Sequence, residues 1–458
     1  MALFKFLEKE DKVKYWDFRH TTLDSTSINL SGETVKDIDN GSVKQYSIRV
    51  LYGNAWGFTS FDNLDKMEEN VIKALKIAKA MSKKTEREII MAQIKPIKDF
   101  KKTRMRVDPV NISLSEKKNL ILEGSIKALD FDRKIKSSDL YYTEKNLYSE
   151  FANSEGSFIQ QRLNYIDAGI FIVASDGMRT VDSHDGIARL GGFEVLRGYP
   201  EAIQKCCDRA LELLTAKSPK TQNANVVIDG ALAGLFIHEA LGHSIEADHV
   251  IKKDSILANK INKKLGTEIL NVYDDPSIEG GFGSYFYDDE GVPSQKTKVI
   301  SNGVLRNFLH SRETAAILCE SPTGNGRAEE AGFFPIPRMS NMYIGKKDYT
   351  DEELIEDLKN GIFVLGQKGG QVNSAEGTFE FGAKQGYLVK NGEITGPLRE
   401  LSFSGNLMKI LKSIKAIGNS YEESDPGYCQ KLGQIIPVDG ANPKMLIKNA
   451  RIIGKNEA

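Results

Sequence analysis

The chain has 458 residues, and its bulk composition excludes several classes of protein. Apolar residues make up 40% and charged residues 27% of the sequence. This is the balance of a globular protein with sizeable hydrophobic cores, and two or three domains are expected at this length. The 62 Lys and Arg residues nearly balance the 63 Asp and Glu residues, so no global field favours nucleic acid or an anionic membrane as a partner.

The N-terminus and the cysteines predict a cytoplasmic protein. Lys5 and Glu8 interrupt the apolar residues of MALFKFLEKEDKVKYW, whereas a secretory signal needs roughly 7–15 apolar residues in a row. No stretch approaches the roughly 18 apolar residues of a membrane-spanning helix. The four scattered cysteines are too few for a disulfide scaffold, so we expect reduced thiols.

Local patterns over residues 1–220 predict an N-terminal α/β domain. Apolar residues recur at helical spacing in three segments, one of which opens on Ser113 and Glu116 in the arrangement of a capping box. Segments rich in Tyr, Phe, Ile and Val predict strands, and two of them flank the turn SEG as a long hairpin. The predicted helices lie at 64–81, 113–129 and 201–216, and the predicted strands at 45–52, 140–153 and 157–175.

The polar run KSPKTQNAN at 217–225 predicts a boundary between a domain at 1–220 and a domain at 221–458. The short apolar run VVID after it predicts a buried strand that leads into a histidine-rich helix. Glycine-punctuated apolar stretches then dominate, and Asn-Gly pairs at 302–303 and 391–392 are typical of tight hairpin turns. The sequence therefore predicts an α+β fold in which a larger, β-rich C-terminal domain carries the histidine helix.

The chemistry of the chain is concentrated in LFIHEALGHSIEADH, residues 235–249. His238 and His243 are five residues apart, whereas the usual zinc-binding helix H-E-x-x-H places its histidines four apart. In a regular helix this spacing directs the two imidazoles roughly 140° apart, but the extra residue of a π-bulge brings both onto one face. Gly242 weakens the helix at this point, so the sequence permits the distortion.

The motif alone leaves two interpretations open. In the first, the two histidines bind a metal ion, and Glu239 acts as general base toward a metal-activated water. Glu246 or Asp248 then orients an imidazole or faces water. In the second, an ordinary helix carries two unrelated histidines. A metal site also needs a third protein ligand from elsewhere, because catalytic zinc is usually held by three.

Cys429 is a candidate for that third ligand. Its neighbours Pro426, Gly427 and Gly433 are turn formers, which predicts a loop that presents the side chain. A small buried hydrophobic residue is the alternative, and it is the commoner fate of a cysteine. A thiolate with two imidazoles is a suitable ligand set for zinc.

Six blocks in order along the chain resemble the TldD/PmbA metalloproteases, specifically the zinc-bearing TldD-like branch. The resemblance covers nearly the whole chain, and so many ordered blocks make it far more specific than the histidine motif alone. The blocks are SIRVLYGNAWGFTSFDNLD (47–65), HEALGH (238–243), YDDEGVPSQKTKVISNGVL (287–305), GRAEEAGFFPIPRMSNMYI (326–344), GGQVNSAEGTFEFGAKQGYLVKNGEITGPLRE (369–400) and PGYCQKLGQIIPV (426–438).

The resemblance implies a Zn²⁺ cofactor held by His238, His243 and Cys429, with Glu239 in the position of the catalytic glutamate. It implies peptides or unfolded protein segments as substrates, which a metal-activated water hydrolyses. It further implies a homodimer, or a heterodimer with a metal-free paralogue of the family. The competing hypothesis is a non-catalytic regulatory or binding subunit in which the metal is structural.

Weaker signals lie outside the histidine motif. The strands around 376–390 are candidates for holding the substrate as an added β-strand, and His310 for steadying an oxyanion in the cleft. His184 is interpreted as a residue of an exposed loop, and the acidic run 288–290 as a polar turn rather than a second metal centre. Three arginines are candidates for binding a peptide carboxylate or for surface salt bridges: Arg327, Arg338 and Arg399.

Overall fold

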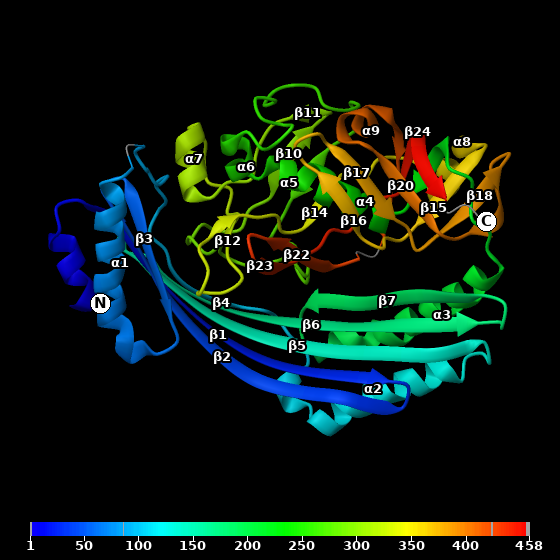
Figure 1. The fold of residues 1–458 in the computed structure, drawn as a ribbon, viewed down its shortest axis with the longest axis horizontal. Coiled ribbons are helices and arrows are strands. Elements are labelled where there is room, and N and C mark those ends of the chain that lie inside the picture. Colours follow the sequence, from blue (N-terminus) through cyan, green and yellow to red (C-terminus); the bar gives the residue numbers. More distant parts are fainter. Residues whose placement is uncertain (1, 86, 423–424, 455–458) are drawn as a thin grey trace.

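A computed structural model describes residues 2–85, 87–422 and 425–454 (Figure 1). Seven strands from the first part of the chain form one curved sheet, and the β-rich second part lies over one of its faces (Figure 1). This arrangement confirms the predicted α+β class. Within these residues, no helix has both the length and the apolar character needed to cross a membrane.

The N-terminal sheet is built from two long hairpins. Its strands are β1 (Val13–Ser31), β2 (Thr34–Tyr52), β3 (Ala55–Phe61), β4 (Lys98–Lys102), β5 (Ile135–Asn153), β6 (Phe158–Ser175) and β7 (Thr180–Leu190). Their order is β3-β2-β1-β5-β6-β4, and β7 also pairs with β6. The β5–β6 hairpin confirms the one predicted from the aromatic and β-branched segments. The loop predicted around His184 is wrong, because His184 lies in β7 and pairs with Phe171.

Three predicted helices pack against this sheet: α1 (Met67–Ser82), α2 (Leu114–Leu129) and α3 (Tyr199–Thr215). The predicted capping box begins α2, because the Ser113 hydroxyl accepts from the Glu116 amide and the Glu116 carboxylate accepts from the Ser113 amide. α2 and α3 bury apolar side chains on the face away from the second part (Figure 1). α1 packs on β3 at Gly57, where an added Cβ would lie 1.9 Å from the Ala74 carbonyl oxygen.

The second part of the chain is organised around a nine-stranded mixed sheet. Its strands are β8 (Gln222–Ile228), β15 (Gly361–Leu365), β16 (Gly370–Asn373), β17 (Thr378–Gly382), β18 (Gln385–Lys390), β19 (Glu393–Leu398), β20 (Leu401–Asn406), β21 (Ile414–Ile417) and β24 (Met445–Gly454). Their order is β16-β17-β20-β24-β8-β15-β18-β19, with β21 paired to β24. β17 and β18 each have a paired strand on both sides. The prediction that strands around 376–390 accept the substrate as an added strand is therefore wrong.

Smaller elements complete the second part. A four-stranded sheet has the order β11-β10-β9-β14, and β12 pairs with β13 and β22 with β23. These strands are β9 (Val272–Asp274), β10 (Thr297–Ser301), β11 (Val304–Leu305), β12 (Gly326–Arg327), β13 (Ile336–Pro337), β14 (Met342–Ile344), β22 (Gly427–Lys431) and β23 (Gln434–Val438). The helices are α4 (Gly230–Phe236), α5 (His243–Ile245), α6 (Ala247–Lys252), α7 (Arg312–Leu318), α8 (Asp351–Leu358) and α9 (Leu407–Ser413).

Short helical segments precede β1 or lie between these elements. Among the residues that the structure describes, four are 3₁₀ segments and one, η5, is a π-helical turn. They are η1 (Ala2–Lys9), η2 (Leu64–Lys66), η3 (Pro109–Asn111), η4 (Phe193–Gly198) and η5 (Ile237–Gly242).

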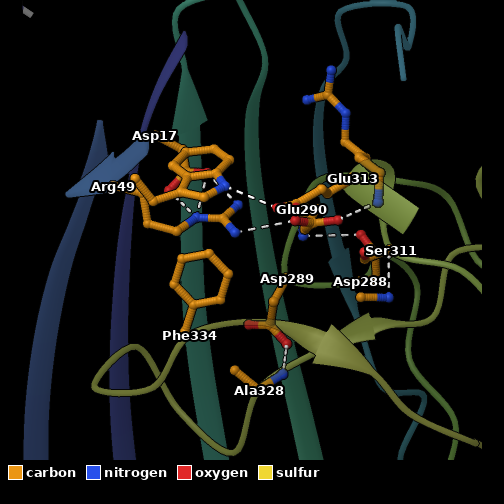
Figure 2. Close-up of polar contacts among 12 residues, drawn as sticks. Asp17, Arg49, Asp288, Asp289, Glu290, Ser311, Glu313, Ala328 and Phe334 are labelled. Atoms are coloured by element: carbon orange, nitrogen blue, oxygen red, sulfur yellow. Dashed lines mark hydrogen bonds and ion pairs between the residues drawn. The ribbon is translucent and has the colours of Figure 1, made fainter. Parts of the chain in front are cut away.

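A buried charged cluster joins the two parts of the chain (Figure 2). Arg49 of β2 is fully buried, and its Nε lies 3.1 and 3.0 Å from the two carboxylate oxygens of Asp17. Its Nη1 donates to Glu290 at 3.1 Å, and its guanidinium lies 4.9 and 4.8 Å from the ring centroids of Trp56 and Phe334. The acidic run that contains Glu290 does form a turn, but the turn is an internal contact with the N-terminal sheet.

Arg49→Met should strongly destabilise the protein. The substitution leaves Asp17 and Glu290 as buried carboxylates without their cation, which typically costs about 3–5 kcal/mol. The urea midpoint of the first unfolding transition should fall accordingly. Lys264→Met, which breaks only an exposed pair with Glu268, is the control and should leave the midpoint unchanged. Equal midpoints for the two variants would show that the buried cluster contributes little.

Candidate metal centre

The histidine helix begins directly at the end of the central strand β8. Asp229 caps it, because the carboxylate accepts hydrogen bonds from the amides of Leu232 and Gly366 at 2.9 and 2.6 Å. α4 then passes into η5 without a break, and buried side chains such as Phe236 and Leu241 pack in the largest hydrophobic core. The sheet and this core therefore fix the direction in which the histidines point.

The π-bulge that the sequence permits is present at Ile237–Gly242. The rings of His238 and His243 have their centroids 5.4 Å apart, although the residues are five positions apart in the sequence. Gly242 also makes room for a neighbour, because a Cβ there would lie 1.9 Å from Sδ of Met339. The distorted turn thus depends on a residue without a side chain at the point where it meets Met339.

Cys429 reaches the histidines from a strand. It lies in β22, pairs with Ile436 of β23 and is 4% exposed. The predicted loop is wrong, because the turn formers around Cys429 lie at the ends of a hairpin. Its Sγ is 3.5 Å from Nε2 of His243, and the ligand atoms of His238, His243 and Cys429 all lie within 4.8 Å of one another.

This group of three residues fits a zinc ion. Zn–S and Zn–N bonds of roughly 2.3 and 2.0 Å place tetrahedral ligands about 3.5 Å apart, which matches the separation of Cys429 Sγ and His243 Nε2. Nε2 of His238 is buried and has no hydrogen-bond partner within the described part of the chain. Buried polar atoms are rarely left in that state, and a metal bond would compensate this one. A soft thiolate with two imidazoles also suits zinc.

Glu239 lies beside this group without belonging to it. Its Oε2 is 3.7 Å from Nε2 of His243, and its side chain is 31% exposed. The carboxylate can therefore contact a water molecule or a substrate at the same place. The structure thus brings together all four residues selected from the sequence, three as candidate ligands and one as a candidate base.

A buried carboxylate orients one of the imidazoles. Glu246 is fully buried, and its Oε2 lies 3.0 Å from Nδ1 of His243 and 3.1 Å from Nζ of Lys431. With Nδ1 donating to this carboxylate, Nε2 of His243 is left to face Cys429. Asp248 instead accepts a hydrogen bond from Lys431 at 2.8 Å. The sequence left open which acid orients a histidine, and the structure selects Glu246.

The candidate ligands shift one another's protonation. Burial favours the neutral thiol of Cys429, but the charge of His238 and the hydrogen bond with His243 hold its pKa below the usual value. Burial likewise disfavours a charged His243, yet hydrogen bonds with Cys429 and Glu246 raise its pKa above the usual value. The charge of Cys429 also outweighs burial at His238 and raises its pKa. By itself, the group favours a thiolate at Cys429 beside a protonated His243.

The other residues selected from the sequence lie outside this group. His310 is buried, and burial lowers its pKa to about 4, so its imidazole is neutral. The three arginines considered as clamps donate hydrogen bonds to backbone carbonyl groups of this chain, and Arg399 also forms a salt bridge with Glu400, which was the alternative. Sequence reasoning gave no positioning role to Arg338 or Lys431, because their partners are remote in the sequence. The arginine contacts are Arg327 with Met339 and Pro437, Arg338 with Cys429 and Gln434, and Arg399 with Ala216.

Comparison with models of known protein families shows to which family the chain belongs. Models of the PmbA/TldA metallopeptidases match three consecutive stretches of the chain. They are domain 1 at residues 16–82, the central domain at 107–215 and the C-terminal domain at 221–454. The chain belongs to the PmbA/TldD metallopeptidase family.

Individual relatives support a metallopeptidase at the level of the family. A metalloprotease of Methanocaldococcus jannaschii is 39% identical over 441 residues, which cover 94% of this chain and 96% of the relative. A Saccharolobus solfataricus protein named zinc metalloprotease TldD homolog is 30% identical over 457 residues, 99% of this chain and 100% of the relative. The crystal structure of TldE from Thermococcus kodakarensis shares the fold, with a TM-score of 0.79 at 19% identity over 99% of both chains.

Metal affinity should rise with pH. An imidazole must lose its proton to coordinate a metal. Because the pKa values of His238 and His243 are raised, protons still compete with the metal above pH of about 6.5, where a free histidine titrates. The Kd for Zn²⁺, measured by chelator competition, should fall roughly tenfold per pH unit for each proton displaced. A Kd independent of pH would mean that both imidazoles are already neutral.

Proposed function

We propose that this protein is a zinc-dependent metallopeptidase that hydrolyses peptides or unfolded protein segments. The observation that carries the proposal is the compact group of two imidazoles and one thiolate, with a partly exposed glutamate 3.7 Å from one imidazole. A perturbed ionisable cluster of this kind is a strong candidate for an active site. Family membership supports the proposal, since one relative is named a zinc metalloprotease.

In the proposed chemistry a metal ion acts as the Lewis acid and one carboxylate transfers the proton. A Zn²⁺ ion bound to His238, His243 and Cys429 would polarise a peptide carbonyl and lower the pKa of a water molecule at the site. Glu239 would accept the proton of the attacking water and deliver it to the amine nitrogen as the C–N bond breaks. Glu246 holds His243 in the tautomer whose Nε2 faces Cys429.

We also propose that the chain works in the cytoplasm as a homodimer or as a heterodimer with a metal-free paralogue. The complete candidate ligand set within one chain supports the catalytic role in either assembly. The proposed domains are 1–220 and 221–458, and the second contains all four site residues. The family models subdivide the first of these into matches at 16–82 and 107–215.

A regulatory or binding subunit with a structural metal is the alternative function. Such a subunit would use the same three ligands, but it has no use for a carboxylate beside them. Glu239 therefore separates the two functions, because only hydrolysis needs a group that takes up and returns a proton.

Glu239→Gln should abolish hydrolysis and keep the metal. Loss of a general base typically slows a reaction about 10²–10⁴-fold, whereas Glu239 is not one of the three candidate ligands. Turnover of a fluorogenic unfolded peptide and the zinc content are measured on the same samples, with Glu268→Gln at an exposed site as the control. Wild-type turnover in Glu239→Gln would favour the structural-metal alternative for this site.

Cys429→Ser should remove most of the bound zinc and lower the melting temperature to that of chelator-treated wild type. The thiolate connects β22 to the histidine helix, so metal binding and the fold of this part support each other. Cys319→Ser, at an exposed cysteine outside the group, is the matched control and should keep the metal. Metal analysis and thermal melts with and without chelator make the test. A wild-type melt that chelator does not change would show that the site needs no metal for its stability.

A further inference from the structure

The hairpin that carries Cys429 has little backbone support of its own. Within the described residues, the ladders of β22 and β23 join only these two strands. The one isolated bridge beside them pairs Asn341 with Asp439, just after the end of β23. The position of Cys429 therefore depends on the side chains and loops that contact the hairpin.

The loop at residues 328–335, between β12 and β13, contacts the hairpin directly; we call it the bridging loop. The Gln434 side chain donates to the carbonyl oxygen of Phe334 at 3.0 Å and accepts from the amide of Glu329 at 3.2 Å. The carboxylate of Glu329 accepts from the amide of Ile435 at 2.8 Å. Three hydrogen bonds thus fix the start of β23 to the bridging loop.

The N-terminal sheet holds the same loop from its other side. The guanidinium of Arg19 donates to the carbonyl oxygens of Ala331 and Phe333, and Oγ1 of Thr21 accepts from the amide of Ala331 at 3.1 Å. The ring of Phe334 lies under the guanidinium of Arg49, and 4.8 Å separates the guanidinium carbon from the ring centroid (Figure 2). The bridging loop is therefore enclosed between the N-terminal sheet and the hairpin that bears Cys429.

Arg338 continues this connection to the candidate ligand itself. It follows β13, is fully buried, and donates from Nη2 to the carbonyl oxygen of Cys429 at 2.6 Å. Its Nε lies 3.9 Å from Oε1 of Glu246, whose other oxygen contacts His243. One guanidinium thus lies between the backbone of Cys429 and the carboxylate that orients His243.

We propose that the bridging loop and Arg338 position Cys429, so that the N-terminal sheet sets how tightly the site in the second part holds its metal. The proposal rests on the metal site of the proposed function, and it deepens that function by naming the residues that position the third ligand. No residue of the N-terminal sheet belongs to the candidate ligand group. Its influence is exerted through the hydrogen bonds and the ring contact at residues 328–335.

The test loosens the bridging loop on each side in turn. Phe334→Ala removes the ring that contacts Arg49. Gln434→Met removes the side-chain hydrogen bonds from the hairpin to Glu329 and Phe334 of the bridging loop while keeping the volume. Loss of a residue that supports a metal ligand typically weakens metal binding about 10–100-fold. Each variant should therefore raise the Kd for Zn²⁺ at least about tenfold. In the Co²⁺-loaded protein, the thiolate-to-cobalt charge-transfer band should lose intensity relative to wild type.

The double variant decides whether the two changes act through one element. If they do, Phe334→Ala with Gln434→Met should weaken binding little more than the stronger single variant, whereas independent effects multiply. Lys117→Met is the matched control, because it breaks a buried ion pair with Glu144 under α2, away from the bridging loop. It should lower the melting temperature and leave both the Kd and the cobalt band unchanged.

The outcomes separate this inference from the proposed function. Two results would overturn the role of the bridging loop and leave the proposed metal site standing. In one, both single variants keep the wild-type Kd and cobalt band, and in the other, their effects multiply in the double variant. A wild-type protein without a thiolate band would overturn the metal site and this inference with it. Should Phe334→Ala not fold, Thr21→Val removes only the acceptor of the Ala331 amide and makes the same test from the N-terminal sheet.

Discussion

The extra residue in the helical turn at Ile237–Gly242 is the constraint from which the candidate site follows. A regular helix would direct His238 and His243 to different sides, roughly 140° apart, and no single ion could bind both. Such turns are rare and are found mostly where function requires them. Here the turn continues α4, whose side chains lie in the largest hydrophobic core. Tertiary packing around the helix therefore stabilises a conformation that the isolated segment would not favour.

The distorted turn supplies only two candidate ligands, and the third candidate, Cys429, comes from a distant segment that the fold holds in place. Glu246 connects the two segments, because one buried carboxylate contacts His243 on the helix and Lys431 on the hairpin of Cys429. An unpaired charge in that position would be costly, and each of these groups compensates another. The helix and the hairpin are thus joined by contacts that are independent of a metal.

Local sequence predicted the elements whose causes are local. The capping box at Ser113, the amphipathic helices and the β5–β6 hairpin follow from neighbouring residues. Helix geometry and Gly242 only permit the π-bulge, and packing in the core stabilises it. Cys429 was selected chiefly through resemblance to a family. Three features depend on the pairing of strands rather than on neighbouring residues. They are the strand of Cys429, the interior positions of β17 and β18, and the place of His184 in β7. Such pairing leaves no mark in a local pattern.

The contact between the two parts of the chain explains why sequence patterns also miss buried charges. Arginine is a residue type that usually lies at the surface, yet Arg49 is enclosed by Asp17, Glu290 and two aromatic rings. An apolar contact would tolerate sliding of one part over the other, because hydrophobic attraction is non-directional. A guanidinium with two carboxylates requires one relative placement, since any shift would separate buried charges. Phe334, at the end of this cluster, belongs to the loop that contacts the cysteine hairpin. A charged contact in this place therefore supports the proposal that the N-terminal sheet helps to position Cys429.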